Sequence, residues 1–333
     1  MRVEDRRSAE CIAPNLPTWA ERTDMQRSEF PDATYTRSWS NGRGEVRFFT
    51  RPDGSRLRYY TAGTGPPLVL MHTVRTQLDY FQRVIPLLWD HYTVYALDLP
   101  GMGWSDIVAG AKYEEPQLRS AVVEFVSGLN LHGLTLAGES LGGALALGAS
   151  IDLKDRVSHV VAFNPYDYPS GLERGNLIAR FIIGSVRAPV LGPVFATLEP
   201  RPIMRAVLHG GYVDKSKLPK DFLSELLRSG RRKGYSKVAR GIYRNLKGLN
   251  RARRRYPEVS APVTLVYSEN DWSRTSERDQ VAGSLTNVQR ITLPSTGHFS
   301  ALERPDAVAR ILIEATSSSP THGRQAPPIP LGE

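Results

Sequence analysis

The sequence predicts a protein of the α/β class, built on a mainly parallel sheet of eight strands with helices on both faces. Residues 67–71 form a short, wholly apolar run, which is typical of a strand buried on both faces of a parallel sheet, and further strand-like runs such as residues 157–163 recur along the chain. Segments with helical spacing of apolar residues alternate with them, which favours parallel pairing through helical crossovers. The 333 residues, 41% of them hydrophobic, suffice for one large domain with an insertion or for two modest domains.

The first residues of the chain are expected to lie outside this sheet, and the first strands to form a hairpin at its edge. Residues 1–42 are polar and contain three prolines, so we interpret them as an irregular N-terminal extension. Residues 45–50 and 56–61 are short β-rich runs joined by the turn-forming sequence PDGS at 52–55. They predict a hairpin, which would place an antiparallel strand at one edge of the sheet.

The remaining strands and helices follow in alternation, and the sheet is completed by two strands late in the chain. Besides the hairpin, the expected strands are residues 67–71, 92–97, 134–137, 157–163, 262–267 and 288–293. The expected helices of the core are residues 116–131, 141–151 and 307–315.

The long interval between the strands at 157–163 and 262–267 predicts an insertion. Residues 165–258 contain helical patterns without a clear strand, so we expect a helical cap over one end of the sheet. The core is then formed by residues 43–164 and 259–316. The tail at 317–333 is polar and rich in proline, and we expect it to be disordered.

The strongest chemical signal is the sequence GESLGG at residues 138–143, which lies between a predicted strand and a predicted helix. A serine on so sharp a turn has a strained backbone, and Gly138 and Gly142 suit the turn because neighbouring backbone passes too close for a Cβ. The turn exposes the Ser140 hydroxyl above the sheet edge and directs the Leu141 N–H, at the positive end of the helix dipole, toward the same place. Ser140 is therefore the predicted nucleophile.

A serine hydroxyl needs a base, and the base needs an acid to orient it. His298 follows the last predicted strand, so its imidazole is placed to overhang the same sheet edge and act as general base. Asp271 follows the strand at 262–267 and is the predicted acid, with Glu269 as a weaker substitute. The alternative for His298 is a structural role, and the alternative for Asp271 is a role in the loop or as a helix cap.

Together these residues resemble the α/β-hydrolase superfamily over residues 45–315. The order Ser, Asp, His along the chain is similar to the order in that family. The loop DLPGMGWSD at residues 98–106 is similar to the family's D-x-P-G-x-G-x-S-D loop, in which the first aspartate, here Asp98, is more often structural than catalytic. The resemblance implies the α/β-hydrolase fold and the triad Ser140, Asp271 and His298, without identifying one activity.

One landmark of the family differs in this chain. After the third strand the family has His-Gly and then a residue whose amide completes the oxyanion hole, whereas this chain reads HTVRTQ at residues 72–77. By position, the Val74 amide would assist that of Leu141. Arg75 and Gln77 either reach into the pocket and bind a carboxylate or carbonyl of the substrate, or fix the loop by hydrogen bonds; both interpretations remain open.

The predicted function is cleavage of an ester or thioester through an acyl-enzyme, as in a carboxylesterase or lipase, acting on a small-molecule acyl substrate. No metal or organic cofactor is implied. The alternatives are an acyltransferase, a carbon–carbon bond hydrolase or an eliminating enzyme on the same triad, and a low-turnover ligand-binding module. The chain resembles haloalkane dehalogenases and epoxide hydrolases in the layout of the cap, but serine rather than aspartate at position 140 argues against those branches.

The charge distribution predicts where the protein meets anionic partners. The net charge is +9, and residues 228–256 are rich in Arg and Lys and contain no Asp or Glu. This run is expected either to contact an anionic membrane surface or an acyl carrier weakly, or to be a solvated helical face. Nucleic acid is not expected as a partner, because no nucleic-acid-binding module surrounds the run. Without a signal peptide or an apolar stretch of membrane-spanning length, the expected location is cytoplasmic, with the membrane periphery as a further option.

Overall fold

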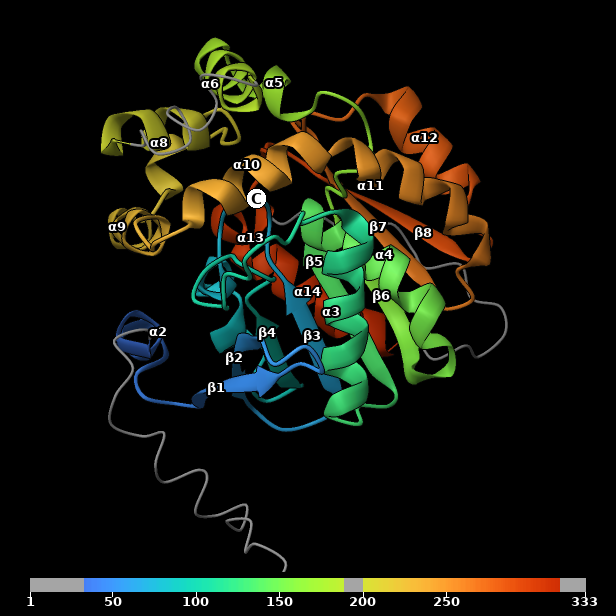
Figure 1. Cartoon of the computed structure of the whole chain (residues 1–333). Helices are drawn as coiled ribbons and strands as arrows, with labels where there is room; N and C mark the ends of the chain where they lie inside the picture. The colour runs from blue at the N-terminus through green and yellow to red at the C-terminus, as the bar shows by residue number, and fades with distance from the viewer. Residues whose placement is uncertain (1–32, 189–199, 318–333) are drawn as a thin grey trace, which may run out of the picture.

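The computed structural model describes residues 33–188 and 200–317, which form a central sheet with helices on both faces (Figure 1). The strands are β1 (Glu45–Thr50), β2 (Arg56–Ala62), β3 (Pro67–Met71), β4 (Thr93–Leu97), β5 (Leu134–Glu139), β6 (Val157–Phe163), β7 (Val263–Ser268) and β8 (Val288–Leu293). They lie in the order β1-β2-β4-β3-β5-β6-β7-β8. The pairs β1–β2 and β2–β4 are antiparallel and the others are parallel. The prediction of a mainly parallel eight-stranded sheet with an antiparallel edge is confirmed.

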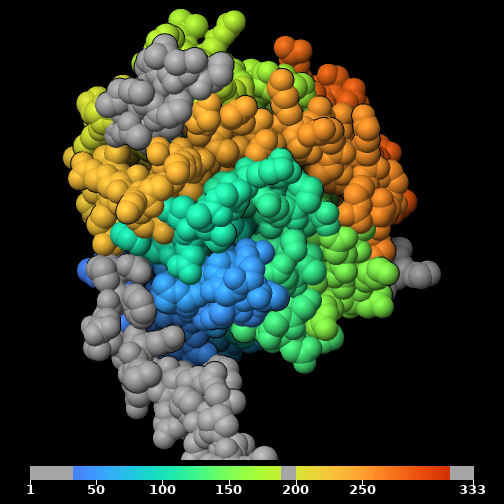
Figure 2. Space-filling model, in the orientation of Figure 1, coloured from blue at the N-terminus to red at the C-terminus, as the bar shows by residue number. Residues whose placement is uncertain are grey.

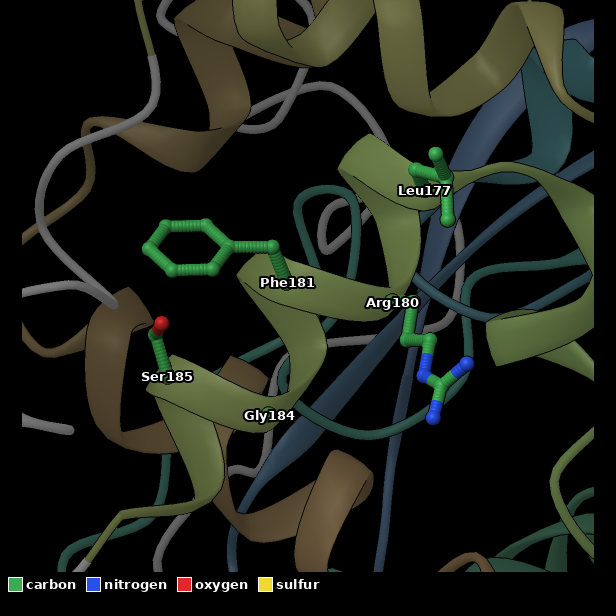
Figure 3. A pocket seen from close by; sticks show the side chains of 5 residues that line it. All are labelled: Leu177, Arg180, Phe181, Gly184 and Ser185. Atoms are coloured by element: carbon green, nitrogen blue, oxygen red, sulfur yellow. The ribbon is translucent and has the colours of Figure 1, made fainter.

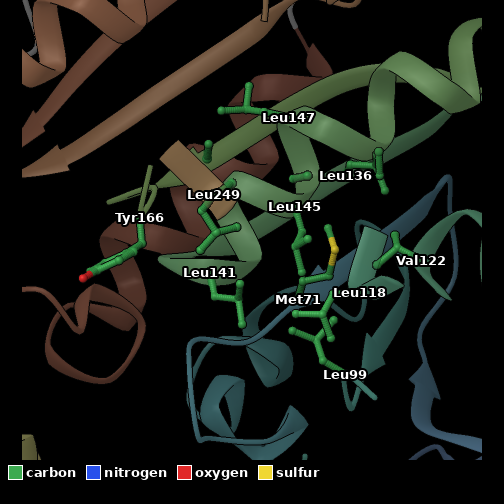
Figure 4. Packing of buried hydrophobic residues seen from close by; sticks show 14 of the residues in the cluster. Met71, Leu99, Leu118, Val122, Leu136, Leu141, Leu145, Leu147, Tyr166 and Leu249 are labelled. Carbon is green, nitrogen blue, oxygen red and sulfur yellow. The ribbon is translucent and has the colours of Figure 1, made fainter. Parts of the chain in front are cut away.

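Helices cover the two faces of the sheet and separate its apolar side chains into two cores. The helices of the main domain are α3 (Glu115–Gly128), α4 (Leu141–Leu153), α12 (Thr275–Gly283), α13 (Ser300–Glu303) and α14 (Pro305–Ser317). In strand β3, Val69 and Met71 join the core that includes α3 and α4, whereas Leu68 and Leu70 join the core that includes α14. Figure 4 shows Met71 among side chains of α3 and α4. Successive side chains of a strand point to opposite faces, which is why this run is apolar throughout.

The N-terminal segment is not irregular throughout, because helix α2 (Thr34–Ser40) lies within it. The Thr36 hydroxyl and the Trp39 indole N–H both donate to Oδ1 of Asp79, at 2.6 and 2.7 Å. Asp79 also pairs with Arg58 at 2.7 Å, and both side chains are fully buried. A buried ion pair of the main domain thus holds the helix in place. No local pattern in residues 1–42 predicts this contact. The predictions for residues 1–32 and 318–333 lie outside the described residues.

The segment between β6 and β7, predicted as a cap, contains short helices that we call the helical insertion. They are α5 (Leu172–Gly175), α6 (Leu177–Arg187), α8 (Arg201–His209), α9 (Lys220–Gly230), α10 (Tyr235–Asn245) and α11 (Lys247–Ala252). Residues near 235–256, drawn in orange in Figure 2, lie directly against the part of the core near residues 100–128. Hydrogen bonds join the two parts: the Arg232 guanidinium donates to the carbonyls of Gly101 and Ser105, at 2.7 and 2.8 Å.

The basic run at 228–256 belongs to the helical insertion. Some of its basic side chains are half-buried and others are exposed. Arg232 and Arg240 are half-buried, and Arg240 donates to the Ala188 carbonyl at 3.1 Å. Other basic side chains of the run are exposed: Arg231, Lys233, Lys237, Arg244, Lys247, Arg251 and Arg254. No helix within residues 33–188 and 200–317 combines the length and the apolar character that crossing a lipid bilayer requires.

Candidate active site

Ser140 lies at the junction of β5 and α4 in the strained conformation that the sequence predicts. Its φ of 58° and ψ of −114° fall outside the regions that L-residues ordinarily occupy. The conformation is held by backbone hydrogen bonds: the Ser140 N–H donates to the Phe163 carbonyl at 2.9 Å, and the Ser140 carbonyl accepts from Ala144 and Tyr166 at 3.1 and 3.0 Å. The surrounding structure therefore fixes a turn that the isolated chain would avoid.

Two glycines make this turn possible. A Cβ on Gly138 would lie 2.4 Å from the carbonyl carbon of Gly142, and a Cβ on Gly142 would lie 2.0 Å from the carbonyl oxygen of Met71. No side chain fits at either place. The close approach also brings the end of β3, and with it the loop that begins at His72, against the first turn of α4.

Asp271 and His298 form the hydrogen-bonded pair expected of an acid and a base. His298 Nδ1 is bonded to Oδ1 of Asp271, and both side chains are fully buried. The other carboxylate oxygen, Oδ2, accepts from the backbone N–H and the hydroxyl of Ser273 and from the Tyr168 hydroxyl. Burial by itself raises the pKa of Asp271, but the neighbouring His298 and these hydrogen bonds outweigh burial and lower the pKa below its usual value.

The imidazole is further fixed by Trp272, which the sequence analysis did not single out. The two rings are stacked with their centroids 3.8 Å apart and their planes 14° apart. The indole N–H of Trp272 donates at 3.0 Å to the carbonyl of Gly210, in the helical insertion. The insertion thereby helps to set the orientation of His298. The only signal in the sequence is the position of Trp272 directly after Asp271.

Glu139, next to the nucleophile, is a second residue that sequence reasoning missed. Its buried carboxylate accepts hydrogen bonds from the Tyr80 hydroxyl and the Ser300 N–H, both at 2.6 Å, and from the Ala301 N–H at 3.2 Å. Burial raises its pKa, and the hydrogen bonds and His298 oppose that rise. Because Ser300 follows His298 by two residues, this carboxylate joins the nucleophile turn to the loop that carries the base.

Ser140 and His298 are thus brought to one buried region, but the bond between them is not formed in this structure. His298 Nε2 is buried and has no hydrogen-bond partner in the part of the chain that the structure describes. Ser140 is itself only 2% exposed. Hydrogen bonds between nucleophile and base are often long before substrate binds, so the arrangement is compatible with the proton transfer that the sequence predicts.

The loop after β3 is fixed by His72, which acts as a structural residue. Its Nδ1 donates to the Thr73 carbonyl at 2.7 Å, and its Nε2 accepts from the Leu99 N–H at 3.0 Å. Burial lowers the pKa of His72 to about 4, so the ring is neutral near pH 7 and keeps this tautomer. Thr76 closes the turn by donating its N–H and its hydroxyl to the Thr73 carbonyl, at 3.3 and 2.9 Å.

This geometry bears on the two predicted oxyanion donors. Val74 lies inside the turn that His72 and Thr76 close, and Leu141 is the first residue of α4. Neither amide donates to an acceptor among the residues that the structure describes. Their assignment as oxyanion donors stays a prediction.

Arg75 and Gln77 have different surroundings. The Gln77 amide nitrogen donates to Asp79 at 2.7 Å and to Glu225 of α9 at 3.3 Å, so this side chain fixes the loop to the core and the insertion. The Arg75 guanidinium instead lies over the rings of Tyr235 and Tyr243 of α10, 5.6 and 5.5 Å from their centroids. Gln77 therefore fixes the loop by hydrogen bonds, which is one of the two interpretations left open, and Arg75 is held against α10 by the two tyrosines.

Asp98 is held as a structural residue, in agreement with the interpretation of its loop. It pairs with the buried Arg58 at 2.7 Å and accepts from the N–H groups of Leu78 and Trp104, at 2.6 and 2.7 Å. Within residues 33–188 and 200–317, no group of three or more His, Cys, Asp or Glu side chains is placed to hold a metal ion.

Comparison with known proteins identifies the family of the chain. The model described as "Alpha/beta hydrolase family" matches residues 68–311. Haloalkane dehalogenase 2 of Mycobacterium bovis is 24% identical over 282 residues, 81% of this chain and 94% of that protein. The (E)-2-((N-methylformamido)methylene)succinate hydrolase of Acinetobacter baylyi is 35% identical over 109 residues, 32% of this chain and 40% of that protein.

Among solved structures, wild-type Cfl2 from Burkholderia cenocepacia superposes with a TM-score of 0.71 at 21% identity, over 81% of this chain and 94% of that one. At this level of sequence identity, the superposition supports a common fold only. The family model covers most of the chain and the sheet has the expected order. The chain therefore belongs to the α/β-hydrolase family.

Proposed function

We propose that this hydrolase cleaves carboxylic esters or thioesters through a covalent acyl-enzyme on Ser140. The observation that supports this most is the conjunction of a serine in the strained turn with a buried Asp271–His298 pair whose Nε2 has no partner in the described part of the chain. A serine hydroxyl becomes an effective nucleophile only beside such an oriented base.

The identity of the nucleophile decides between acyl and alkyl chemistry. A carboxylate that displaces halide or opens an epoxide forms an ester, whose carbonyl carbon water can attack. A serine hydroxyl that did the same would form an ether, which has no carbonyl for water to attack. Ser140 therefore favours substrates that present a carbonyl carbon. The likeness to haloalkane dehalogenase 2 then concerns the scaffold and not the reaction.

The proposed steps follow from the placement of the groups. His298 Nε2 takes the Ser140 proton while Oγ attacks the carbonyl carbon, and the amides of Leu141 and Val74 donate to the oxyanion. The bond to the alcohol or thiol breaks, and the leaving group receives the proton from His298. Water, deprotonated by the same imidazole, then attacks the carbonyl carbon of the acyl-enzyme, the bond to Ser140 Oγ breaks, and His298 returns the proton to Oγ as the carboxylic acid leaves. Asp271 holds the imidazole in the required tautomer throughout.

The test is a screen of nitrophenyl esters and thioesters of varied chain length, in parallel with fluorophosphonate labelling of the folded protein. We expect turnover of at least one chain length and labelling of Ser140. An added alcohol that captures the acyl group as a new ester would identify an acyltransferase instead. Labelling of Ser140 without turnover of any ester would favour a carbon–carbon hydrolase or an eliminating enzyme on the same triad, and failure of both turnover and labelling would favour a ligand-binding module.

A further inference from the structure

We propose that Arg75, together with Tyr235 and Tyr243, forms a subsite that binds a carboxylate of the substrate beside Ser140. This inference rests on the proposed acyl chemistry, because it names the class of ester that the site takes. It assigns to Arg75 the binding role that the sequence left open.

Arg75 lies in the loop that follows β3, and the start of this loop packs against the first turn of α4. Arg75 directly follows Val74, the predicted oxyanion donor, and its backbone is in the left-handed region with φ of 57°. That conformation is uncommon for a residue other than glycine, and it persists only where the surroundings hold it. The side chain is 7% exposed, so the loop carries a cation into the interior between the core and α10.

Helix α10 covers Arg75 and also approaches the residue that follows the nucleophile. Tyr235 and Tyr243 lie two turns apart on this helix, and both rings contact the guanidinium. Ile242, the neighbour of Tyr243, lines a small cavity whose wall also includes Leu141, the residue after the nucleophile. A substrate bound beneath α10 with its carbonyl at Ser140 would therefore extend toward Arg75.

The chemistry of this subsite suits a carboxylate. The tyrosine rings stabilise a cation through their π-faces but leave its charge in place. A second guanidinium, that of Arg232, lies 5.9 Å from the ring of Tyr235. Burial strengthens the attraction of these cations for an anion, and a guanidinium presents two parallel N–H groups that match the two oxygens of a carboxylate.

The kinetic test compares nitrophenyl monoesters of dicarboxylic acids with nitrophenyl esters of uncharged acids of equal length. We expect a higher kcat/KM for the anionic series, and we expect Arg75→Met to lower the ratio of anionic to neutral kcat/KM by about tenfold to hundredfold, mainly through KM. Arg75→Lys should restore part of the ratio. The control Arg244→Met replaces an exposed arginine of α10, the helix that carries Tyr235 and Tyr243, and it should leave the ratio unchanged. If Arg75→Met lowers both series equally, Arg75 merely supports the loop and the inference is wrong.

A binding measurement separates this inference from the proposed function. Succinate, glutarate and adipate are titrated calorimetrically into Ser140→Ala and into the double variant that also carries Arg75→Met. Saturable binding that the double variant loses supports the subsite, even if fluorophosphonate labelling fails and the acyl chemistry is abandoned. Equal binding by both variants, or binding of none of the three diacids, overturns it.

A different observation leads us to infer that helix α6 docks the protein on an anionic membrane surface. Leu177, Ile178 and Phe181 are 81%, 48% and 64% exposed, although large apolar side chains are usually buried. Figure 3 shows Leu177 and Phe181 projecting from α6, with Arg180 beside them. Ala179, Ile183 and Val186, on the opposite side of the helix, are buried.

The charges around α6 complement an anionic lipid surface. Helices α8 and α10 both contact α6. Arg201 and Arg205 of α8, and Lys237 and Arg244 of α10, are exposed. Residues 165–258 carry 20 Lys and Arg against 7 Asp and Glu, so this segment holds more than the whole net charge of +9. An apolar helix face flanked by cations is the pattern of a helix that lies in the lipid interface.

The test is sedimentation with vesicles of phosphatidylcholine, with and without phosphatidylserine, at low and high salt. We expect salt-sensitive binding to the vesicles that contain phosphatidylserine, weakened about tenfold or more by Leu177→Ser with Phe181→Ser. The control is Leu87→Ser, which replaces a leucine of the main domain, outside the helical insertion, that is 42% exposed. Binding that the double variant retains, binding to an acidic acyl carrier protein but not to vesicles, or a dimer that the double variant dissociates would each overturn the inference.

Discussion

Replacement of Ser140 by alanine is expected to lower kcat/KM for the best nitrophenyl ester by about 10⁴-fold or more, while the protein stays folded. In the proposed mechanism the hydroxyl oxygen is the atom that becomes acylated, and the Asp271–His298 pair acts through it. The variant is compared by ester turnover, by fluorophosphonate labelling and by its urea unfolding midpoint.

The matched control for this substitution is Ser158→Ala, which removes an exposed serine hydroxyl from β6. It should retain wild-type turnover. Ser140→Gly is a second inactive variant, and it should be more stable than Ser140→Ala by about 1 kcal/mol, because glycine accepts a positive φ without strain. Undiminished turnover in Ser140→Ala would remove this residue from the mechanism.

Replacement of Asp271 by asparagine is expected to lower kcat by about 10⁴-fold, with a smaller change in KM. The amide group of asparagine offers an N–H where the carboxylate accepted one. It therefore favours the histidine tautomer with the proton on Nε2, which cannot accept the Ser140 proton. The matched control is Glu269→Gln, which changes the other acid of the same loop. Its carboxylate accepts from the Ser295 N–H at the surface, so its loss should leave kcat within about threefold of wild type. A larger loss for Glu269→Gln than for Asp271→Asn would exchange their roles.

The same variant also tests the pKa of Asp271 through stability. The folded-state pKa is lowered, so the ionised form stabilises the fold above the unfolded-state pKa of about 4 and loses this effect as the pH falls through the folded-state pKa. The difference in unfolding free energy between wild type and Asp271→Asn should therefore shrink as the pH is lowered from about 6 to about 3. A difference that stays constant over this range would contradict the lowered pKa.

The sequence predicted the sheet well because its strands carry their own signal. A strand buried on both faces must be apolar at every position, so β3 stands out within the chain without any knowledge of its partners. The nucleophile turn could also be predicted from the sequence, because the close backbone contacts of such a turn leave room only for glycine at positions 138 and 142.

The structure decided what depends on contacts between distant segments. Helix α2 is short and polar, and it is fixed by Asp79, some 40 residues away along the chain. Glu139 and Trp272 were overlooked because their roles arise from Ser300 and Gly210, which nothing nearby in the sequence indicates.

By itself, then, the sequence determined the fold class and the order of the strands along the chain, because periodicity and turn chemistry are local properties, and it singled out Ser140, Asp271 and His298 as the predicted triad. Only the tertiary structure decided that Gln77 binds carboxylates of the protein itself while Arg75 packs against two tyrosines of α10. The physical reason is that the partner of a buried polar side chain is set by the packing of elements far apart in the chain, and such packing leaves no periodic trace in the residues that it joins.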